Sequence, residues 1–275
     1  MTRPQERVLA IVQARMSSSR LPGKVLRPLL GQPMLERQIE RLRRSKGIER
    51  LIVATSTDGS DHPIEQLCIR IGLPCFRGSL NDVLDRYYQA ACRFGGEVIV
   101  RLTGDCPLID PEIIDRGIAF FLEGAYHYVS NTIERTFPIG LDTELFRIAD
   151  LREAWSLAVL PSEREHVTPY FHNHPEKYTI GQFRHSENLS HHRWTVDEPA
   201  DFEFVSRVYE ALYPSNPCFT TAQVLELLRR RSDLTKINYD IVHGAGWTKS
   251  LMADEIFLTR GDEKRTSDKI ETITR

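Results

Sequence analysis

Short apolar segments alternate with amphipathic segments up to about Gly124, and this alternation restricts the possible folds more than any other feature. Four apolar runs are short and rich in Val and Ile, as buried strands are: residues 7–14, 51–54, 74–76 and 98–102. The segments between and after them place apolar residues at helical spacing: residues 34–46, 61–71 (with Asp61 as the expected cap), 82–94 and 111–122. Strands separated by helices pair in parallel through right-handed crossovers. We therefore expect an α/β fold with a mainly parallel sheet and helices on both faces.

The second half of the chain is less regular. Its strand-like runs are residues 126–130, 141–146 and 193–196, and its helical patterns are residues 149–158, 163–172, 200–212 and 221–231. We expect a smaller, irregular α+β insertion in this half. The predicted organisation is one domain, residues 1–235, with an insertion at 136–190 for dimerisation or acceptor binding, and a polar C-terminal tail at 236–275.

Composition excludes several classes of protein. The 36 Lys and Arg residues are balanced by 38 Asp and Glu residues, whereas a nucleic-acid-binding surface normally has an excess of basic residues. No apolar run approaches the roughly 18 residues of a membrane span. The apolar run near the start, residues 8–12, is too short for a signal peptide. We therefore expect neither nucleic acid nor a membrane as a partner.

The cysteines indicate a cytoplasmic protein with reduced thiols. They are five in number, widely spaced and without a CxxC pair: Cys68, Cys75, Cys92, Cys106 and Cys218. This pattern fits neither a disulfide framework nor a zinc knuckle. Two histidine pairs have no cysteine or carboxylate at zinc-ligand spacing, so we do not expect them to bind a metal: His172 with His174, and His191 with His192.

The loop after the first predicted strand, residues 14–24, is a candidate site for a polyphosphate. It joins a buried strand to a helix, so it lies at the carboxyl edge of the sheet, where open α/β sheets bind ligands. It combines long cations, hydroxyls and a glycine that permits close backbone approach: Arg15, Arg20, Lys24, Ser17, Ser18, Ser19 and Gly23. Such a set suits phosphate oxygens. The loop contains neither GxxxxGK[ST] nor GxGxxG, and its composition alone leaves open that it is a solvated basic loop.

This loop resembles a known signature. The segment IVQARMSSSRLPGKVL is similar to the N-terminal signature of cytidylyltransferases that activate acidic sugars, above all the CMP-Kdo synthetases (PARxxSxRLPGKxL), and more loosely the CMP-sialate synthetases. From about Val8 to Leu228 the chain resembles the SpsF-like family of spore coat polysaccharide biosynthesis, through FRGSLNDVLDRYYQAA, RLTGDCPLIDPEIID, SNTIERTFPIGLDTELF, SEREHVTPY and RWTVDEPADFEFV. The resemblance implies a fold of the nucleotide-diphospho-sugar transferase (GT-A-like) type. It also implies that Arg15 and Lys24 hold the nucleotide phosphates and act in catalysis, with Ala14, Ser19 and Arg20 as further nucleotide contacts.

Two aspartates follow predicted strands and are candidate metal ligands. Asp105 ends the run VIVRLTGD, and Asp197 follows residues 193–196. Mg²⁺ needs only one or two carboxylates in addition to phosphate oxygens and waters. The segments GDCPL and VDEPAD resemble GDEPL and VDTPED of the Kdo family, whose aspartates are its metal ligands. The resemblance therefore implies that Asp105 and Asp197 bind Mg²⁺ and that Asp105 is catalytic. Taken alone, either aspartate could instead cap the helix that begins near Pro107 or Pro199.

Further candidates concern the nucleoside and the acceptor. In the related families the segment after the third strand approaches the base and ribose, so the resemblance implies Ser79, Asp82 and Arg86 as nucleotide contacts. Asp82 could equally cap the helix at 82–94. Polar residues of mixed charge in the second half suit a ligand with an acidic group and hydroxyls or an amine: Asn131, Arg135, Asp142, Glu144, Arg164, Glu165 and His166. Residues 163–166 could instead be a solvated first turn of a helix.

These features predict a Mg²⁺-dependent nucleotidyltransferase that uses CTP, transfers CMP to an acidic sugar or related small acidic acceptor, and releases pyrophosphate, for polysaccharide or related biosynthesis. Two alternatives stay open: a GT-A-type glycosyltransferase and a non-catalytic nucleotide-binding protein. The first usually carries Asp-x-Asp, whereas Gly104-Asp105-Cys106 has one carboxylate; the second has little need of two metal carboxylates. The related enzymes pair through the insertion, and residues 136–190 are rich in apolar side chains, so we expect a homodimer.

Overall fold

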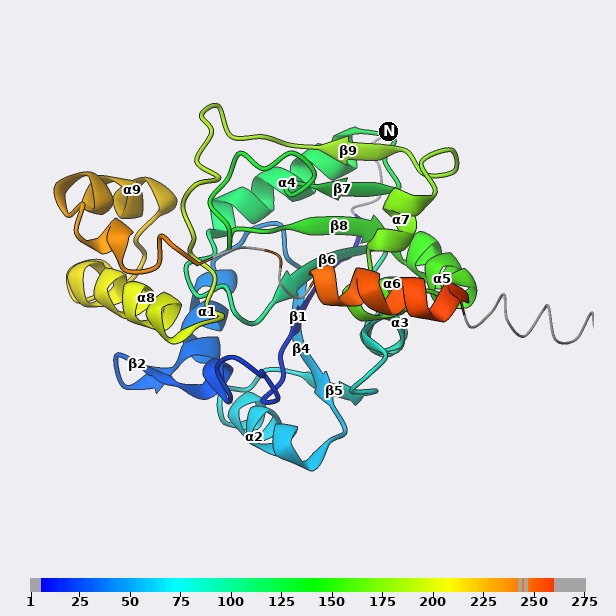
Figure 1. Ribbon diagram of the computed structural model, residues 1–275, viewed down its shortest axis with the longest axis horizontal. Coiled ribbons are helices and arrows are strands. Elements are labelled where there is room, and N and C mark those ends of the chain that lie inside the picture. Colours follow the sequence, from blue (N-terminus) through cyan, green and yellow to red (C-terminus); the bar gives the residue numbers. More distant parts are fainter. Residues whose placement is uncertain (1–5, 242–243, 245–246, 260–275) are drawn as a thin grey trace, which may run out of the picture.

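The computed structural model describes residues 6–241, 244 and 247–259 (Figure 1). Within them, one sheet contains seven strands in the order β5-β4-β1-β6-β8-β7-β9. The strands are β1 (Val8–Gln13), β4 (Arg50–Ser56), β5 (Cys75–Gly78), β6 (Val98–Thr103), β7 (Tyr128–Ser130), β8 (Glu144–Arg147) and β9 (Ile180–Gln182). β1, β4, β5 and β6 pair in parallel, β8 is antiparallel to β6 and β7, and β9 is parallel to β7. The expected α/β fold with a mainly parallel sheet is confirmed.

Helices cover both faces of this sheet (Figure 1). Val8, Ala10 and Val12 of β1 lie in one core, together with apolar residues of α1 (Met34–Leu42), α2 (His62–Arg70), α4 (Pro111–Glu123), α8 (Pro199–Leu212) and α9 (Thr221–Arg230). Leu9 and Ile11 lie in a second core with residues of α3 (Val83–Phe94), α5 (Ile148–Leu157) and α7 (Pro169–Asn173). Because both of its faces are covered, β1 is a continuous apolar run rather than an alternating one.

The strand expected at residues 193–196 is a wrong prediction. The structure has only an isolated parallel bridge there, between Ile139 and Arg193. Trp194 N donates to the Ile139 carbonyl at 2.7 Å, whereas Val196 N donates to the Asp105 carbonyl at 2.8 Å. Since the N–H groups of alternate residues, 194 and 196, bind different segments, no ladder continues, although all four side chains of this segment are buried.

Several very short strands had no sequence signal. β9 has three residues, and β2 (Pro28–Leu29) and β3 (Gln32–Pro33) form a separate two-stranded hairpin with two residues each. Such segments are too short for the twofold alternation that identifies a half-buried strand. Residues 136–190 contribute both β8 and β9 to the main sheet, so this segment continues the sheet beyond β6.

The C-terminal region contains ordered elements. A 3-10 turn, η3, spans Leu234–Lys236, and residues 247–259 form a further helix, called the C-terminal helix below. It is the red helix beside α6 (Pro161–His166) in Figure 1. Of the predicted polar tail 236–275, residues 260–275 lie outside the described residues.

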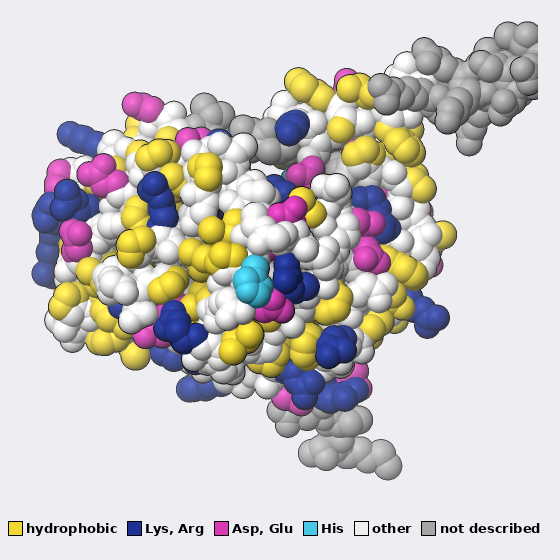
Figure 2. Space-filling view, turned by 90° about the horizontal axis from the view of Figure 1, so that it is seen from below, with side chains coloured by type: hydrophobic (Ala, Val, Ile, Leu, Met, Phe, Trp, Pro, Cys, Tyr) yellow, Lys and Arg dark blue, Asp and Glu magenta, His cyan; other side chains and the backbone are white. Residues whose placement is uncertain are grey.

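The surface has mixed character. On the face shown in Figure 2, Lys and Arg side chains are interspersed with Asp and Glu, and apolar side chains lie between them. This distribution agrees with the formal net charge of −2. Among the described residues, no helix combines the length and the apolar character that crossing a bilayer requires.

Candidate active site

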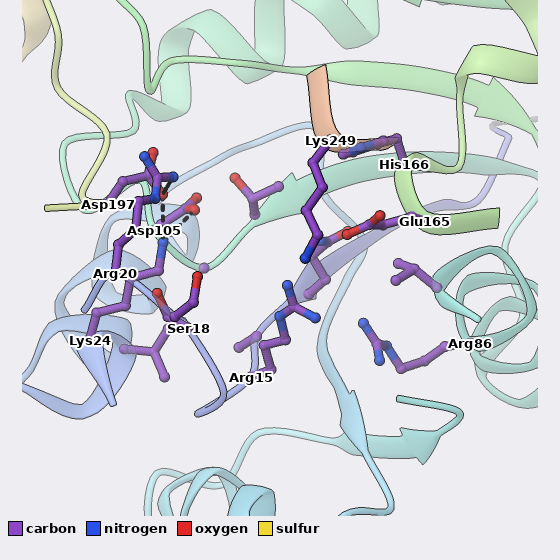
Figure 3. A pocket seen from close by; sticks show the side chains of 17 residues that line it. Arg15, Ser18, Arg20, Lys24, Arg86, Asp105, Glu165, His166, Asp197 and Lys249 are labelled. Carbon is purple, nitrogen blue, oxygen red and sulfur yellow. Dashed lines mark hydrogen bonds and ion pairs between the residues drawn. The ribbon is translucent and has the colours of Figure 1, made fainter. Parts of the chain in front are cut away.

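A cavity of about 410 Å³ lies at the carboxyl ends of β1 and β6 (Figure 3). Many of the residues that the sequence singled out line it: Ala14, Arg15, Ser19, Arg20, Lys24, Arg86, Asp105, Glu165, His166 and Asp197. The others lie outside its lining: Ser79, Asp82, Asn131, Arg135, Asp142, Glu144 and Arg164. The structure therefore brings the predicted phosphate loop, both predicted metal ligands and part of the predicted acceptor set to one place.

Asp61 holds the loop at residues 14–24 in position. Its Oδ1 accepts the Met16 N–H at 2.6 Å, and its Oδ2 accepts the Ser56 N–H at 3.1 Å and the Ser56 hydroxyl at 2.5 Å. The carboxylate is fully buried. Asp61 stands at the N-cap position of α2, but its side chain makes no capping bond, so the expected cap is wrong. The carboxylate instead ties the loop after β1 to the end of β4, a positioning role that the sequence analysis missed.

Two glycines shape the path of the backbone around the cavity. Gly23 has a φ of +68°, in the left-handed region, where it begins the 3-10 turn η1 (Lys24–Leu26). Gly104 lies so close to β1 that an added Cβ would be 3.0 Å from the Gln13 carbonyl oxygen and from the Ala14 Cβ. A larger residue at 104 would push the end of β6 away from β1, and Asp105 with it.

Lys24 connects the two candidate metal ligands. Its Nζ lies 2.9 Å from Asp105 Oδ2 and 3.0 Å from Asp197 Oδ1, and it donates to the Val196 carbonyl at 2.8 Å (Figure 3). Burial disfavours the charged form of Lys24, but the two carboxylates outweigh it and raise the pKa of the ammonium. Burial also disfavours the charged form of Asp105, but Lys24 outweighs it and lowers the pKa of Asp105 to about 2. Both groups are therefore charged at neutral pH.

Asp197 is further held by two arginines. Arg20 contacts its Oδ1 at 3.0 Å, and the buried Arg193 contacts its Oδ2 at 3.0 Å. Asp201 accepts the backbone N–H groups of Asp197 and Glu198 at 2.9 Å and 3.0 Å, which fixes the start of α8. The N-cap residues are Asp110 for α4 and Glu198 for α8. Neither Asp105 nor Asp197 is a helix cap, so helix capping does not explain why an aspartate stands at either position.

The low pKa of Asp105 predicts a loss of stability in acid. An aspartate has a pKa of about 3.9 when unfolded, so the ion pair stabilises the fold above that pH, and the contribution disappears as the pH falls through the folded value of about 2. Its size at neutral pH is about 2 kcal/mol, of which about half is lost by about pH 3. Urea unfolding of the wild type and Asp105→Asn should differ by less at pH 3 than at pH 7. An equal difference at both pH values would contradict the assignment.

A second group of cations faces the cavity without carboxylate partners. Among the described residues, the Arg15 guanidinium makes no hydrogen bond or ion pair. Arg86 is only 1% exposed and donates to the Ser79 carbonyl at 2.7 Å, while its Nε has no partner. Burial, followed in effect by the nearby Arg15 charge, lowers the pKa of Arg86. This buried and incompletely bonded guanidinium is suited to bind an anion or a polar base edge.

The other predicted nucleotide contacts have structural partners. Ser79 Oγ accepts the N–H of Asp82 at 3.0 Å. Asp82 caps α3 through the N–H of Asp85 at 2.8 Å, and it forms an ion pair with Arg164. The capping role that the sequence left open for Asp82 is therefore present in the structure, and the pair holds α6 against the start of α3.

The predicted acceptor residues separate into two groups. Glu165 and His166, at the end of α6, line the cavity, and burial followed by the charge of Arg101 lowers the pKa of His166, which favours its neutral form at pH 7. The remaining residues bond to other side chains or to the backbone outside the cavity lining: Arg135 pairs with Asp142, Asn131 braces Leu141 and Thr143, Arg164 pairs with Asp82, and Glu144 pairs with Arg101.

Glu144 is expected to be a strong contributor to stability. It is 7% exposed, pairs with Arg101, and accepts hydroxyl bonds from Tyr128 at 2.7 Å and Thr168 at 2.6 Å. Glu144→Gln should lower the free energy of unfolding by about 3 kcal/mol, because it leaves a buried guanidinium unpaired. Asp142→Asn breaks a more exposed pair and should cost at most about 1 kcal/mol. Urea denaturation measures both values, and equal losses would contradict the prediction.

Lys249 is a lining residue that the sequence analysis did not single out. It comes from the C-terminal helix, inside the predicted tail, and reaches the cavity from the wall formed by Glu165 and His166 (Figure 3). Nothing in its local sequence distinguishes it from a solvated lysine.

The sequence and the fold of this chain are similar to those of known proteins. Residues 9–226 match the cytidylyltransferase family. The spore coat polysaccharide biosynthesis protein SpsF of Bacillus subtilis is 36% identical over 235 residues, which cover 82% of this chain and 95% of that protein. The structure of a cytidylyltransferase from Leptospira borgpetersenii is similar with a TM-score of 0.81 and 34% identity, and covers 86% of this chain and 100% of that chain.

A more distant structure shares the fold. CMP:2-keto-3-deoxy-manno-octonic acid synthetase complexed with CTP has a TM-score of 0.60 and 19% identity, over 74% of this chain and 98% of that chain. The match at residues 9–226 includes the loop after β1, Asp105 and Asp197, so the expected resemblance is confirmed for the part of the chain that carries the site. The chain belongs to the cytidylyltransferase family.

Proposed function

We propose that the protein transfers CMP from CTP to an acidic sugar or a related small acid, in a Mg²⁺-dependent reaction that releases pyrophosphate, for polysaccharide or related biosynthesis. The observation that carries the proposal is the contact of Lys24 with both Asp105 and Asp197 in the cavity that Arg15 also lines, where Arg15 has no ion-pair partner among the described residues. The similarity to SpsF and to a synthetase complexed with CTP supports it. We place the reaction in the cytoplasm because all five cysteines are free thiols.

The side chains of the cavity suit the charge changes of this reaction. An acceptor oxygen attacks the α-phosphorus of CTP, the bond to the β-phosphate breaks, and pyrophosphate leaves. Negative charge grows on the non-bridging and leaving oxygens. Arg15 and Arg20 neutralise it through charge-assisted hydrogen bonds, and the positive charge of Lys24 adds to their effect. Because Asp61 and Gly23 fix the loop before the nucleotide binds, little reorganisation is needed at the moment of reaction.

The donor atoms fit a Mg²⁺ ion. Asp105 and Asp197 supply hard carboxylate oxygens that converge on one ammonium group, and Mg²⁺ completes its shell with waters and phosphate oxygens. We propose that these two aspartates hold the metal. When bound, the metal acts as a Lewis acid on the phosphate oxygens, and Lys24 serves as the counter-charge of the carboxylates.

Pyrophosphate release tests the proposed reaction. The protein is incubated with each nucleoside triphosphate, Mg²⁺ and a panel of sugar acids. The proposal expects pyrophosphate only with CTP and an acid, and no product after chelation of the metal. Release of a nucleoside diphosphate from a sugar nucleotide would identify a glycosyltransferase instead. Nucleotide binding without turnover on any acceptor would identify a non-catalytic binding protein.

We propose that the protein is a homodimer that pairs through residues 136–190. Part of the apolar content of this segment completes the monomer core, since Phe137, Leu145 and Phe146 are buried. Leu157 and Val159 are 52% and 64% exposed, however, and such side chains favour a contact surface. Light scattering at micromolar concentration should give about twice 31.7 kDa, whereas a mass near 31.7 kDa would contradict the dimer.

A further inference from the structure

The C-terminal helix lies beyond residues 9–226, the segment matched to the cytidylyltransferase family, and one of its residues, Lys249, lines the cavity (Figure 3). Its buried residues fasten it to α6. The Ser250 hydroxyl donates to Glu165 Oε2 at 2.8 Å and lies 2.9 Å from His166 Nε2. Ser250 is 3% exposed. The helix is therefore docked on Glu165 and His166, which also line the cavity.

A second contact fixes the direction of the helix. Asp254, one helical turn after Ser250, accepts the N–H of Ser162 in the first turn of α6 at 2.8 Å and is 8% exposed. The Trp247 ring lies 5.2 Å from the His166 ring, measured between centroids. Contacts on successive turns prevent rotation about the helix axis, so they also fix the side from which Lys249 leaves the helix.

Lys249 extends from this wall into the cavity, toward Arg15 (Figure 3). Neither its ammonium nor the Arg15 guanidinium has a hydrogen-bond or ion-pair partner among the residues that the structure describes. Arg86 adds a third positive charge to the same space. Like charges repel one another, and an anionic ligand beside Lys249 would turn this repulsion into attraction. Arg15 lies between Lys249 and the pair Lys24 and Arg20, so it can face the triphosphate while Lys249 faces a second anion (Figure 3).

The position of Lys249 indicates which anion it meets. Lys24 and Arg20 lie on one side of the cavity, and Lys249 lies on the opposite side next to Glu165 (Figure 3). The proposed triphosphate site is at the first side. The proposed Mg²⁺ ligands, Asp105 and Asp197, lie on the first side, so a polyphosphate there would share the metal with them. On the second side a polyphosphate would face the Glu165 carboxylate without that metal. A ligand with one acidic group and a neighbouring hydroxyl or amine would satisfy both residues of this wall.

We propose that Lys249 binds the acidic group of the acceptor and that Glu165 accepts a hydrogen bond from an acceptor hydroxyl or amine. Lys249 is thus a specificity-determining residue contributed by the C-terminal helix. This inference rests on the proposed function, because it takes the triphosphate and the acceptor to occupy opposite sides of one cavity.

Calorimetric titration tests this inference. Glucuronate, galacturonate, N-acetylneuraminate and 3-deoxy-manno-octulosonate are titrated into the protein with CMP present, beside glucose and galactose as neutral sugars. The wild type should bind at least one acid and neither neutral sugar. Lys249→Gln should weaken binding of that acid tenfold or more, and Lys249→Arg should restore most of it. Lys46→Gln removes a charge from an exposed position outside the cavity and should change nothing.

The affinity for CTP distinguishes a failure of this inference from a failure of the proposed function. Lys249→Gln should weaken the binding of CTP by much less than it weakens the binding of the acid, because Lys249 lies near Arg15 but the triphosphate is proposed to bind to the loop at residues 14–24 and not to Lys249. Three results would each overturn this inference. Lys249→Gln could weaken the binding of CTP and of the acid equally, the wild type could fail to bind any acid, or the affinity for the acid could be the same in the wild type and in Lys249→Gln. Absence of CTP binding to the wild type would instead overturn the proposed function.

Discussion

Replacement of Asp105 by asparagine is expected to lower the turnover number with CTP by about 100- to 1,000-fold. The substitution is nearly isosteric but removes the negative charge that Lys24 contacts at 2.9 Å and one of the two carboxylates proposed to hold Mg²⁺. The variant should keep its far-ultraviolet circular dichroism, because Gly104 and the β6 backbone still position residue 105. Pyrophosphate release at saturating CTP and acceptor measures the effect.

Two further variants test whether the loss of turnover is specific to the carboxylates proposed to hold the metal. Glu112→Gln removes a carboxylate from an exposed position in the first turn of α4, and it should retain wild-type turnover. Asp197→Asn should reproduce the loss seen for Asp105→Asn, since the two carboxylates share Lys24. Near-normal turnover of Asp105→Asn would show that this aspartate is only a turn residue.

Lys24→Ala and Arg15→Ala are both expected to weaken binding of CTP by about tenfold to a hundredfold, and binding of CMP by much less. Both cations belong to the loop after β1 and are proposed to face the β- and γ-phosphates. Their effects on stability should differ. Lys24→Ala leaves Asp105 and Asp197 without their shared cation and should lower the melting temperature, whereas Arg15 has no partner among the described residues to lose.

Fluorescence titration with CTP and CMP, together with thermal unfolding, measures this pair. Lys46→Ala provides the matched control for an exposed lysine outside the cavity. Equal losses for CTP and CMP would place the two cations elsewhere, for example on the acceptor. A lower melting temperature for Arg15→Ala would show that this arginine supports the fold.

The parallel half of the sheet could be predicted because its signals are local. β1 and β6 are buried on both faces and are continuous apolar runs, and α3 and α4 begin at capping aspartates, Asp82 and Asp110. The segment at 193–196 contains the aromatic and β-branched residues that strands favour, but backbone pairing depends on a partner strand far away in sequence. There the neighbouring segments accept single bonds rather than a ladder.

The site was predictable where a chemical motif is contiguous, as in the loop from Ala14 to Lys24. Asp61 and Lys249 could not be found in this way. Asp61 has the local sequence of a helix cap, and only the folded chain brings it to Met16. In the C-terminal helix, Leu251, Met252 and Ile256 are exposed while Ser250 and Asp254 are buried. Apolar periodicity would therefore have predicted the wrong face of this helix as the buried one.

The order in which the cavity walls occur along the chain has a consequence for biosynthesis. During translation the last strand of the sheet, β9, is complete at Gln182, whereas the wall that carries Lys249 begins at residue 247. A nascent chain can therefore fold the proposed nucleotide side of the cavity before Lys249 completes the proposed acceptor side. A product of proteolysis that has lost residues 247–259 would likewise lack Lys249. We expect it to lose selectivity between acceptors while it still binds the nucleotide.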